Sequence, residues 1–181
     1  MEQQTIDVKV GKILKEYILS TNGSDVLVVE KASVLWGLIL QHLVGIRDLF
    51  NQDGVDYVPI RAEECAEYIK ITILDSSHWK TYSVEEKKCL KIHTDVRCFL
   101  SRRGQNIVRR FLYKEFRKTF IDYMRGALNN NCDLQQKEAI YEFCTDHDLS
   151  LDNITLDALQ KSWYRWKKKH GLLDKVCSIN Y

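Results

Sequence analysis

Apolar residues recur at helical spacing along much of the chain. The first stripe occupies positions i, i+3, i+4, i+7 and i+8, the pattern of one buried helix face. Its members are Val10, Ile13, Leu14, Tyr17 and Ile18. The small and polar residues 21–25 are expected to end this helix in a turn. The short β-branched run Asp25–Val29 follows and is the one segment that we interpret as a candidate strand.

Further stripes and capping residues predict a series of helices downstream. These predicted helices cover residues 34–50, 61–73, 83–101, 105–128, 133–145 and 155–169. Their expected N-cap residues include Ser33, Ser83, Asp133 and Thr155. Between the third and fourth of them, Arg102-Arg103-Gly104 is expected to turn or kink the chain, and Gly171 is placed to end the last helix.

This pattern predicts an all-α fold with at most one short strand or hairpin near residues 25–30. We expect an orthogonal bundle of several helices that ends in a helix-turn-helix-like pair. Asp75-Ser76-Ser77-His78 is the most plausible seam. It divides the chain into an acidic N-terminal helical subdomain, residues 1–82, and a basic C-terminal one, residues 83–181, over one continuous core.

Composition agrees with a single cytoplasmic domain. The chain has 181 residues, a formal net charge of +2 and six Cys residues, of which no two are close enough for a Cys-x-x-Cys pair. We expect reduced thiols. The longest apolar run, Val34–Ile46, is too short to span a membrane, and the first residues do not have the pattern of a signal peptide. The expected location is the cytoplasm or a particle assembled there, without a membrane partner.

The small net charge conceals a blocked charge pattern. Residues 97–125 carry a net charge of +7, residues 133–157 carry −6, and residues 158–175 carry +5. Acidic and basic blocks of this size either pair with each other or bind partners of opposite charge.

The predicted long helix supplies most of the basic candidates. At about 100° per residue, several of its cations project on one side, with apolar residues on the other. Arginine and lysine side chains on such a face suit phosphate groups. The alternative is a solvated face, partly paired with residues 133–157. The candidate phosphate-contacting residues are Arg102, Arg103, Arg110, Lys114, Arg117, Lys118 and Arg125.

The last predicted helix is the second basic candidate. It resembles the second helix of a generic helix-turn-helix arrangement, which enters the major groove of DNA. The preceding loop, 146–153, is longer than usual and acidic. Trp163 and Trp166 are expected in the core, and Tyr164 is expected to be exposed. The nucleic-acid-binding candidates here are Lys161, Tyr164, Arg165, Lys168 and Lys169.

Metal binding and catalysis have little support in the sequence. Cys89 with His93, and Cys144 with His147, have spacings that could ligate zinc, but we interpret them as chance spacings. The chain has none of the common phosphate-loop, metalloprotease or nucleophile-elbow motifs. We therefore expect no enzyme activity, no metal or other cofactor and no small-molecule substrate.

Two hypotheses rank far ahead of a third, an enzyme whose site assembles from scattered residues. The first is a helical, non-enzymatic protein that binds the phosphate backbone of nucleic acid through the basic helix face and the C-terminal basic helix. The second is a structural or assembly protein, such as a component of a viral or mobile-element particle. Such a protein would oligomerise with itself or a partner protein through complementary acidic and basic patches.

Overall fold

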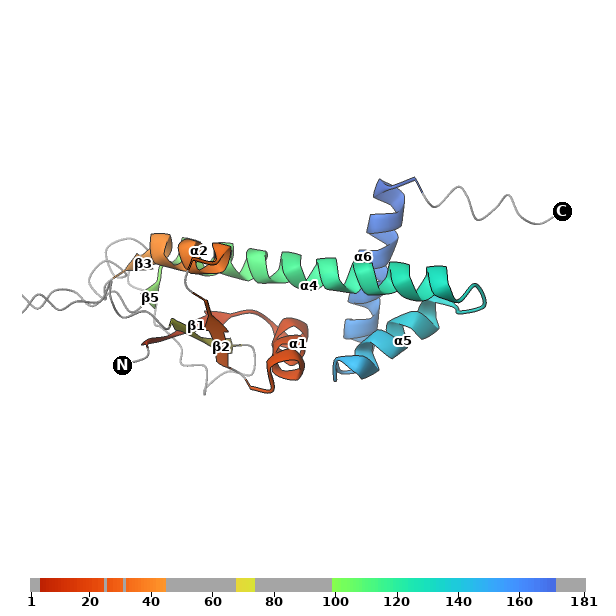
Figure 1. Ribbon diagram of the computed structural model, residues 1–181, viewed down its shortest axis with the longest axis horizontal. Coiled ribbons are helices and arrows are strands. Elements are labelled where there is room, and N and C mark those ends of the chain that lie inside the picture. The colour runs from red at the N-terminus through yellow and green to blue at the C-terminus, as the bar shows by residue number, and fades with distance from the viewer. Residues whose placement is uncertain (1–3, 25, 31, 45–67, 74–98, 172–181) are drawn as a thin grey trace, which may run out of the picture. The chain divides into compact units, whose positions relative to one another are not determined.

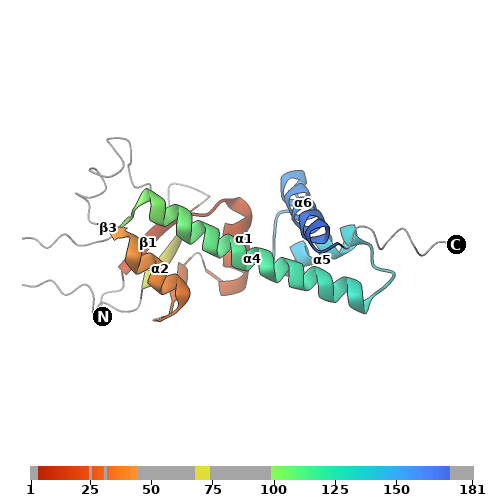
Figure 2. The ribbon, with the colours of Figure 1, turned by 90° about the horizontal axis from the view of Figure 1, so that it is seen from above.

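The computed structural model describes residues 4–24, 26–30, 32–44, 68–73 and 99–171 (Figures 1 and 2). The chain forms two compact units, an N-terminal unit, Met1–Leu112, and a C-terminal unit, Tyr113–Tyr181. The boundary falls inside the longest helix. The predicted seam near residue 75 and the boundary between residues 82 and 83 lie outside the described residues.

The N-terminal unit combines helices with short strands. Its elements are β1 Gln4–Lys9, α1 Lys12–Asn22, β2 Val26–Val29, α2 Val34–His42, β3 Leu43–Val44, β4 Tyr68–Ile73, β5 Phe99–Leu100 and the start of α4 Arg102–Asn130. One three-stranded sheet has the order β1-β4-β2, and a two-stranded sheet joins β3 to β5. The all-α prediction is therefore wrong, although the described residues are mostly helical and the candidate strand within 25–29 is present as β2.

The central strand β4 is the main error of the sequence prediction. It pairs antiparallel with β1, where Ile6 faces Ile71, and parallel with β2, where Leu27 faces Ile71. Ile69 and Ile71 have no exposed surface, and the neighbouring Thr72 is also buried. This segment was predicted to form the last turns of a helix over residues 61–73, because acidic residues occur near the expected N-terminal end of that helix. Isoleucine and threonine are β-branched, however, and their stiff side chains pack well on both faces of a central strand.

The strand β1 shows the alternation that the helical reading missed. Ile6, Val8 and Val10 are buried, whereas Thr5 and Lys9 are exposed. This period of two is typical of a strand with one face on the core. The helix that follows, α1, begins at Lys12 and buries Leu14 and Ile18 as the sequence predicted.

The helices α2 and α4 cover the same face of the three-stranded sheet in the N-terminal unit (Figures 1 and 2). Ser33 caps α2 as predicted, because its Oγ accepts a hydrogen bond from the Trp36 amide. The helix ends at His42 and not near Phe50, since the chain enters β3, which pairs with β5. Of the helix predicted over residues 83–101, residues 83–98 lie outside the described residues, and Phe99–Leu100 form the strand β5.

The C-terminal unit is helical. It contains residues 113–130 of α4, α5 Gln136–Asp146 and α6 Asn153–Lys169. Its core centres on Phe143 of α5, whose ring lies 5.0 Å from that of Phe120 and 5.2 Å from that of Tyr123. In this unit α6 crosses the C-terminal part of α4 at a steep angle (Figures 1 and 2).

The caps of α5 and α6 differ from the predicted ones. Gln135 forms a capping box with Glu138, so α5 does not begin at Asp133. Asp152 caps α6, because its Oδ1 accepts a hydrogen bond of 2.7 Å from the Thr155 amide. The Asp152 carboxylate therefore fills the N-cap role at the first turn of α6. The Thr155 hydroxyl had been predicted for this role. Gly171 follows the end of α6 with φ 64°, as predicted for a helix-ending glycine.

Candidate nucleic-acid interface

The first turns of α4 carry a cluster of exposed arginines. We call Arg102, Arg103, Arg109 and Arg110 the α4 arginine cluster. A turn or kink was predicted at residues 102–104, but these residues form the first helical turn of α4. The Ser101 hydroxyl makes this possible, since it accepts a 3.1 Å hydrogen bond from the Gly104 amide in the manner of an N-cap.

The start of α4 is fixed to the surrounding strands. The Ser101 amide donates a 3.0 Å hydrogen bond to the carbonyl of His42. The side-chain amide of Gln105 makes two long hydrogen bonds to β1, accepting from the Lys9 amide at 3.5 Å and donating to the Asp7 carbonyl at 3.4 Å. Because the helix backbone is held at these points, the arginines extend from a rigid base.

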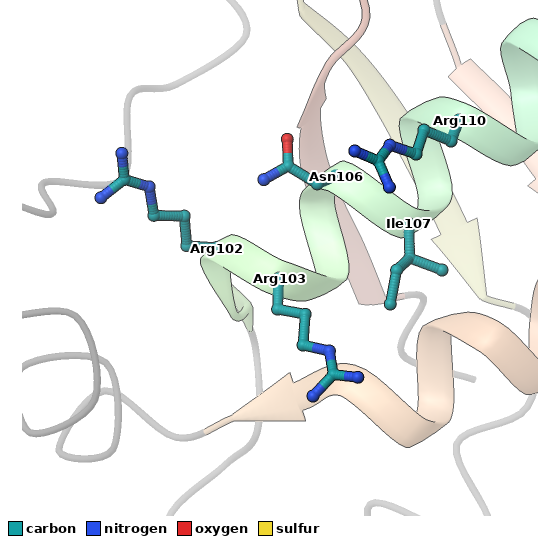
Figure 3. A pocket seen from close by; sticks show the side chains of 5 residues that line it. All are labelled: Arg102, Arg103, Asn106, Ile107 and Arg110. Atoms are coloured by element: carbon teal, nitrogen blue, oxygen red, sulfur yellow. The ribbon is translucent and has the colours of Figure 1, made fainter.

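Two open depressions lie beside the α4 arginine cluster, and Arg102 and Asn106 line both. The larger has a volume of about 490 Å³ and is also lined by Arg103, Ile107 and Arg110. Figure 3 shows Arg102 and Arg103 leaving the helix in different directions, while Arg110 folds back toward the N-terminal end of the helix. The smaller, of about 320 Å³, is also lined by Lys9, Tyr68, Gln105 and Arg109.

The electrostatics of this helix end favour an anion. The first turn of α4 contains no acidic residue, and it carries Arg102 and Arg103. A helix N-terminus already has a partial positive charge, so cations there are unfavourable by about 0.3–1 kcal/mol each. Among the described residues, no carboxylate lies within ion-pair distance of Arg103 or Arg110, and the Arg109 guanidinium donates to Asn106. A bound anion would relieve this accumulation of positive charge.

A second basic surface lies entirely within the C-terminal unit. Lys114, Arg117, Lys118 and Arg125 of α4 line a depression of about 250 Å³, which we call the α4–α6 groove. The lining is completed by Ile121 and Asp122 of α4 and by Trp166 of α6. The acidic contribution is small, because Asp122 lies 3.8 Å from the Arg125 guanidinium in an exposed pair. The groove therefore has a positive rim and an apolar part.

The basic residues of α4 do not form the single straight face that the sequence predicted. Ile121 projects in the middle of that face, yet it is 6% exposed, and Arg117 is half-buried. The buried positions follow a strict spacing of four residues: Gly104, Val108, Leu112, Phe116, Phe120 and Met124. Four residues advance an α-helix by about 400°, so this row rotates around α4 by about 200° in total. The cations consequently divide into the α4 arginine cluster and the rim of the α4–α6 groove.

The basic residues of α6 are mostly explained by the helix itself. Lys167, Lys168 and Lys169 occupy the last turn, where the helix dipole favours cations. Lys161 pairs with Asp157 at 3.6 Å, and Lys167 donates to Gln136 while partial burial lowers its pKa. Lys161, Tyr164, Arg165, Lys168 and Lys169 are exposed but lie outside the lining of the three depressions described above.

The tryptophans of α6 divide between core and groove. Trp163 is 6% exposed, which confirms the predicted burial, and Tyr164 is 51% exposed as predicted. Trp166 was predicted in the core but is half-buried and lines the groove. Lys9, Asn106 and Arg109, which also line the depressions, were not among the predicted contacts. Arg109 could have been included as a candidate because it is adjacent to Arg110, which was predicted as a phosphate contact.

Several carboxylates of the acidic block have local partners. Glu138 and Asp152 cap helices, Asp146 accepts a hydrogen bond from Tyr123, and Asp157 pairs with Lys161. These contacts explain much of the acidic composition of residues 133–157 without an ion pair to the α4 arginine cluster.

Metal ligation finds no support in the described part of the chain, where no three His, Cys, Asp or Glu side chains converge. Cys89 and His93 lie outside it. Cys144 is a buried free thiol, and the His147 ring packs on Phe143 at 4.5 Å.

Among the described helices, none combines the length and the apolarity of a membrane-spanning segment. Comparisons with known protein families, curated proteins and solved structures found no match for this chain.

Proposed function

We propose that this protein binds nucleic acid through its phosphate backbone, as a binding protein without catalytic activity, and that the α4 arginine cluster is a principal contact. The observation that carries the proposal is the composition of the first turn of α4, which contains Arg103 and no acidic residue, with Arg110 exposed two turns further along the same helix. Local helix energetics disfavour this arrangement, and such exceptions are expected at functional sites.

The chemistry of the cluster fits phosphate. A guanidinium group donates two parallel hydrogen bonds to phosphate oxygens, and its charge displaces counterions from the nucleic acid. The free amides at the start of α4 add to the same positive field. Exposed arginines at several angles around one helix end suit a charged chain better than a small enclosed ligand, and the neighbouring depressions are open to solvent.

The assembly alternative has less support. It requires the acidic residues 133–157 to be available to another copy, but two of their carboxylates, those of Glu138 and Asp152, already cap helices of the C-terminal unit. The charges of Arg103 and Arg110 have no such partner among the described residues.

The proposal is tested with the double variant R103E/R110E. Binding of a fluorescently labelled oligonucleotide is measured by anisotropy at two salt concentrations, and light scattering reports the oligomeric state. We expect the variant to lose most of the salt-sensitive affinity while the helical circular dichroism is retained. The control K12E/K137E changes the net charge equally at exposed positions outside the cluster. Equal affinity of R103E/R110E and wild type would refute the cluster as the contact site, and salt-sensitive self-association without oligonucleotide binding would favour assembly.

A further inference from the structure

We infer that single-stranded nucleic acid occupies the α4–α6 groove, with a base against the apolar part of the groove and phosphates on its cationic rim. This inference deepens the proposed function and rests on it, because it specifies the form of nucleic acid and a second contact region. The groove belongs to the C-terminal unit and shares no residue with the α4 arginine cluster.

The rim of the groove supplies the phosphate contacts. Lys114, Lys118 and Arg125 are exposed, and Arg117 is half-buried. Among the described residues, no carboxylate lies within ion-pair distance of Lys114, Arg117 or Lys118. The one ion pair at the rim, between Arg125 and Asp122, is long at 3.8 Å, and both side chains are 56% exposed. Solvent screens such a pair, so Arg125 can exchange Asp122 for a phosphate at little cost.

The floor of the groove supplies a planar apolar contact. The Trp166 ring lies parallel to that of Trp163, with centroids 5.0 Å apart and an interplanar angle of 9°. His170 packs on Trp166 at 4.6 Å, and Trp163 itself is buried. These neighbours hold the Trp166 ring in one orientation. The Ile121 side chain extends the apolar surface at the same depression.

Arg125 joins the floor to the rim. Its guanidinium carbon lies 5.7 Å from the centroid of the Trp166 ring, which places the charged group over the indole. Unstacked bases are recognised by stacking on aromatic rings and on arginine guanidinium planes. The Arg125 side chain therefore combines a stacking surface with a phosphate contact at one position.

This combination selects single strands over duplex. In a duplex the bases are stacked inside, so a duplex can use the rim but gains nothing from Trp166. A single strand can turn a base into the groove and use both. A peptide of glutamates alone has no ring to place against Trp166 and would use only the rim. The depressions at the α4 arginine cluster differ, because the aromatic residue that lines one of them, Tyr68, is 8% exposed.

The experiment compares matched single-stranded and duplex oligonucleotides on the full chain. The first variant is R125K, which keeps the charge but removes the guanidinium plane at an exposed site. The second is W166A, with W166F as the conservative partner. We expect W166A to weaken single-strand binding by about 5- to 100-fold and duplex binding much less, with W166F closer to wild type. R125K should also weaken single-strand binding selectively. I154A, which removes an exposed apolar side chain of α6 outside the groove, should leave both affinities unchanged.

Several outcomes would overturn the inference. One is an equal loss of single-strand and duplex binding in R125K, and another is competition by poly-glutamate as effective as that by the single strand at the same ionic strength. If W166A disturbs the fold, as judged by near-ultraviolet circular dichroism, R125K decides. Loss of binding in R103E/R110E together with wild-type behaviour of R125K and W166A would leave the proposed function intact and remove this inference. The reverse result would retain the groove and remove the α4 arginine cluster.

Discussion

Gly104 lies directly against His42, where α4 begins beside the end of α2. A Cβ atom added to Gly104 would stand 2.5 Å from the Cβ of His42 and 3.2 Å from the Ser101 Oγ. His42 Cβ is bonded to the backbone and cannot rotate away. The backbones of α2 and α4 therefore approach closely because this position has no side chain, and the approach places the α4 arginine cluster next to β3.

The variant G104A should accordingly be destabilised. Alanine favours a helix over glycine by up to about 1 kcal/mol, but overpacking costs about 1–3 kcal/mol, so we expect a net loss of about 1 kcal/mol or more. Urea denaturation measures it. In G126A of the same helix, the added Cβ meets nothing within 4 Å. That variant should gain about 0.5–1 kcal/mol, and equal effects in the two variants would contradict the close contact.

The variant R103E should change stability and binding in opposite directions. Glutamate in the first turn of α4 interacts favourably with the helix dipole, so the free energy of unfolding should rise by about 0.5–1 kcal/mol. Nucleic-acid affinity should fall, and the slope of log K against log salt should decrease by about 0.7–0.9 for the lost phosphate contact. Thermal denaturation and anisotropy titration measure these effects. A loss of both stability and binding would show that Arg103 has a structural role.

Trp163 should behave as a core residue. We expect W163A to destabilise the protein by about 3–5 kcal/mol, measured by chemical denaturation. The Trp163 Nε1 group is buried without a hydrogen-bond partner in the structure. W163F should therefore cost much less than W163A, because it keeps a ring and removes the unsatisfied donor. Y164A provides the surface control and should stay within about 0.5 kcal/mol of wild type.

Tyr123 should titrate at high pH. Its pKa is raised from 10.0 to about 12, first by burial, then by the hydrogen bond that its hydroxyl donates to Asp146 at 3.1 Å, and by the negative charges of Asp146 and Glu142. Between these two pKa values the unfolded state has released the proton and the folded state retains it. The contribution of Tyr123 to stability is therefore complete below pH 10 and is lost as the pH rises toward 12.

The variant D146N checks the cause of this shift. It removes one negative charge and the carboxylate acceptor, so the pKa of Tyr123 should move part of the way back toward 10, with the effect of burial remaining. Tyrosinate absorbance, taken as a difference against Y123F, follows this single residue. E142Q should give a smaller change, and an unchanged pKa in D146N would exclude the hydrogen bond as a cause.

The sequence by itself determined the features that depend on neighbouring residues. The stripe of α1 with Leu14 and Ile18 buried, the Ser33 cap of α2 and the glycine end of α6 are examples. The burial of Trp163 and the exposure of Tyr164 also followed from helical spacing. The cap and the glycine act within a few residues along the chain, and the helical period by itself separates the apolar face of a helix from its polar face.

Only the tertiary structure decided the features that depend on distant partners. The strand β4 exists because β1 and β2 pair with it on either side, and no local pattern identifies those partners. The buried row of α4 turns around the helix because its positions follow a spacing of four. The sequence prediction had assumed that the same side of α4 stays buried along its whole length. Trp166 lies in a groove and not in the core because α6 crosses α4 there. Burial is set by what packs against a residue, and this information is distributed over the whole chain.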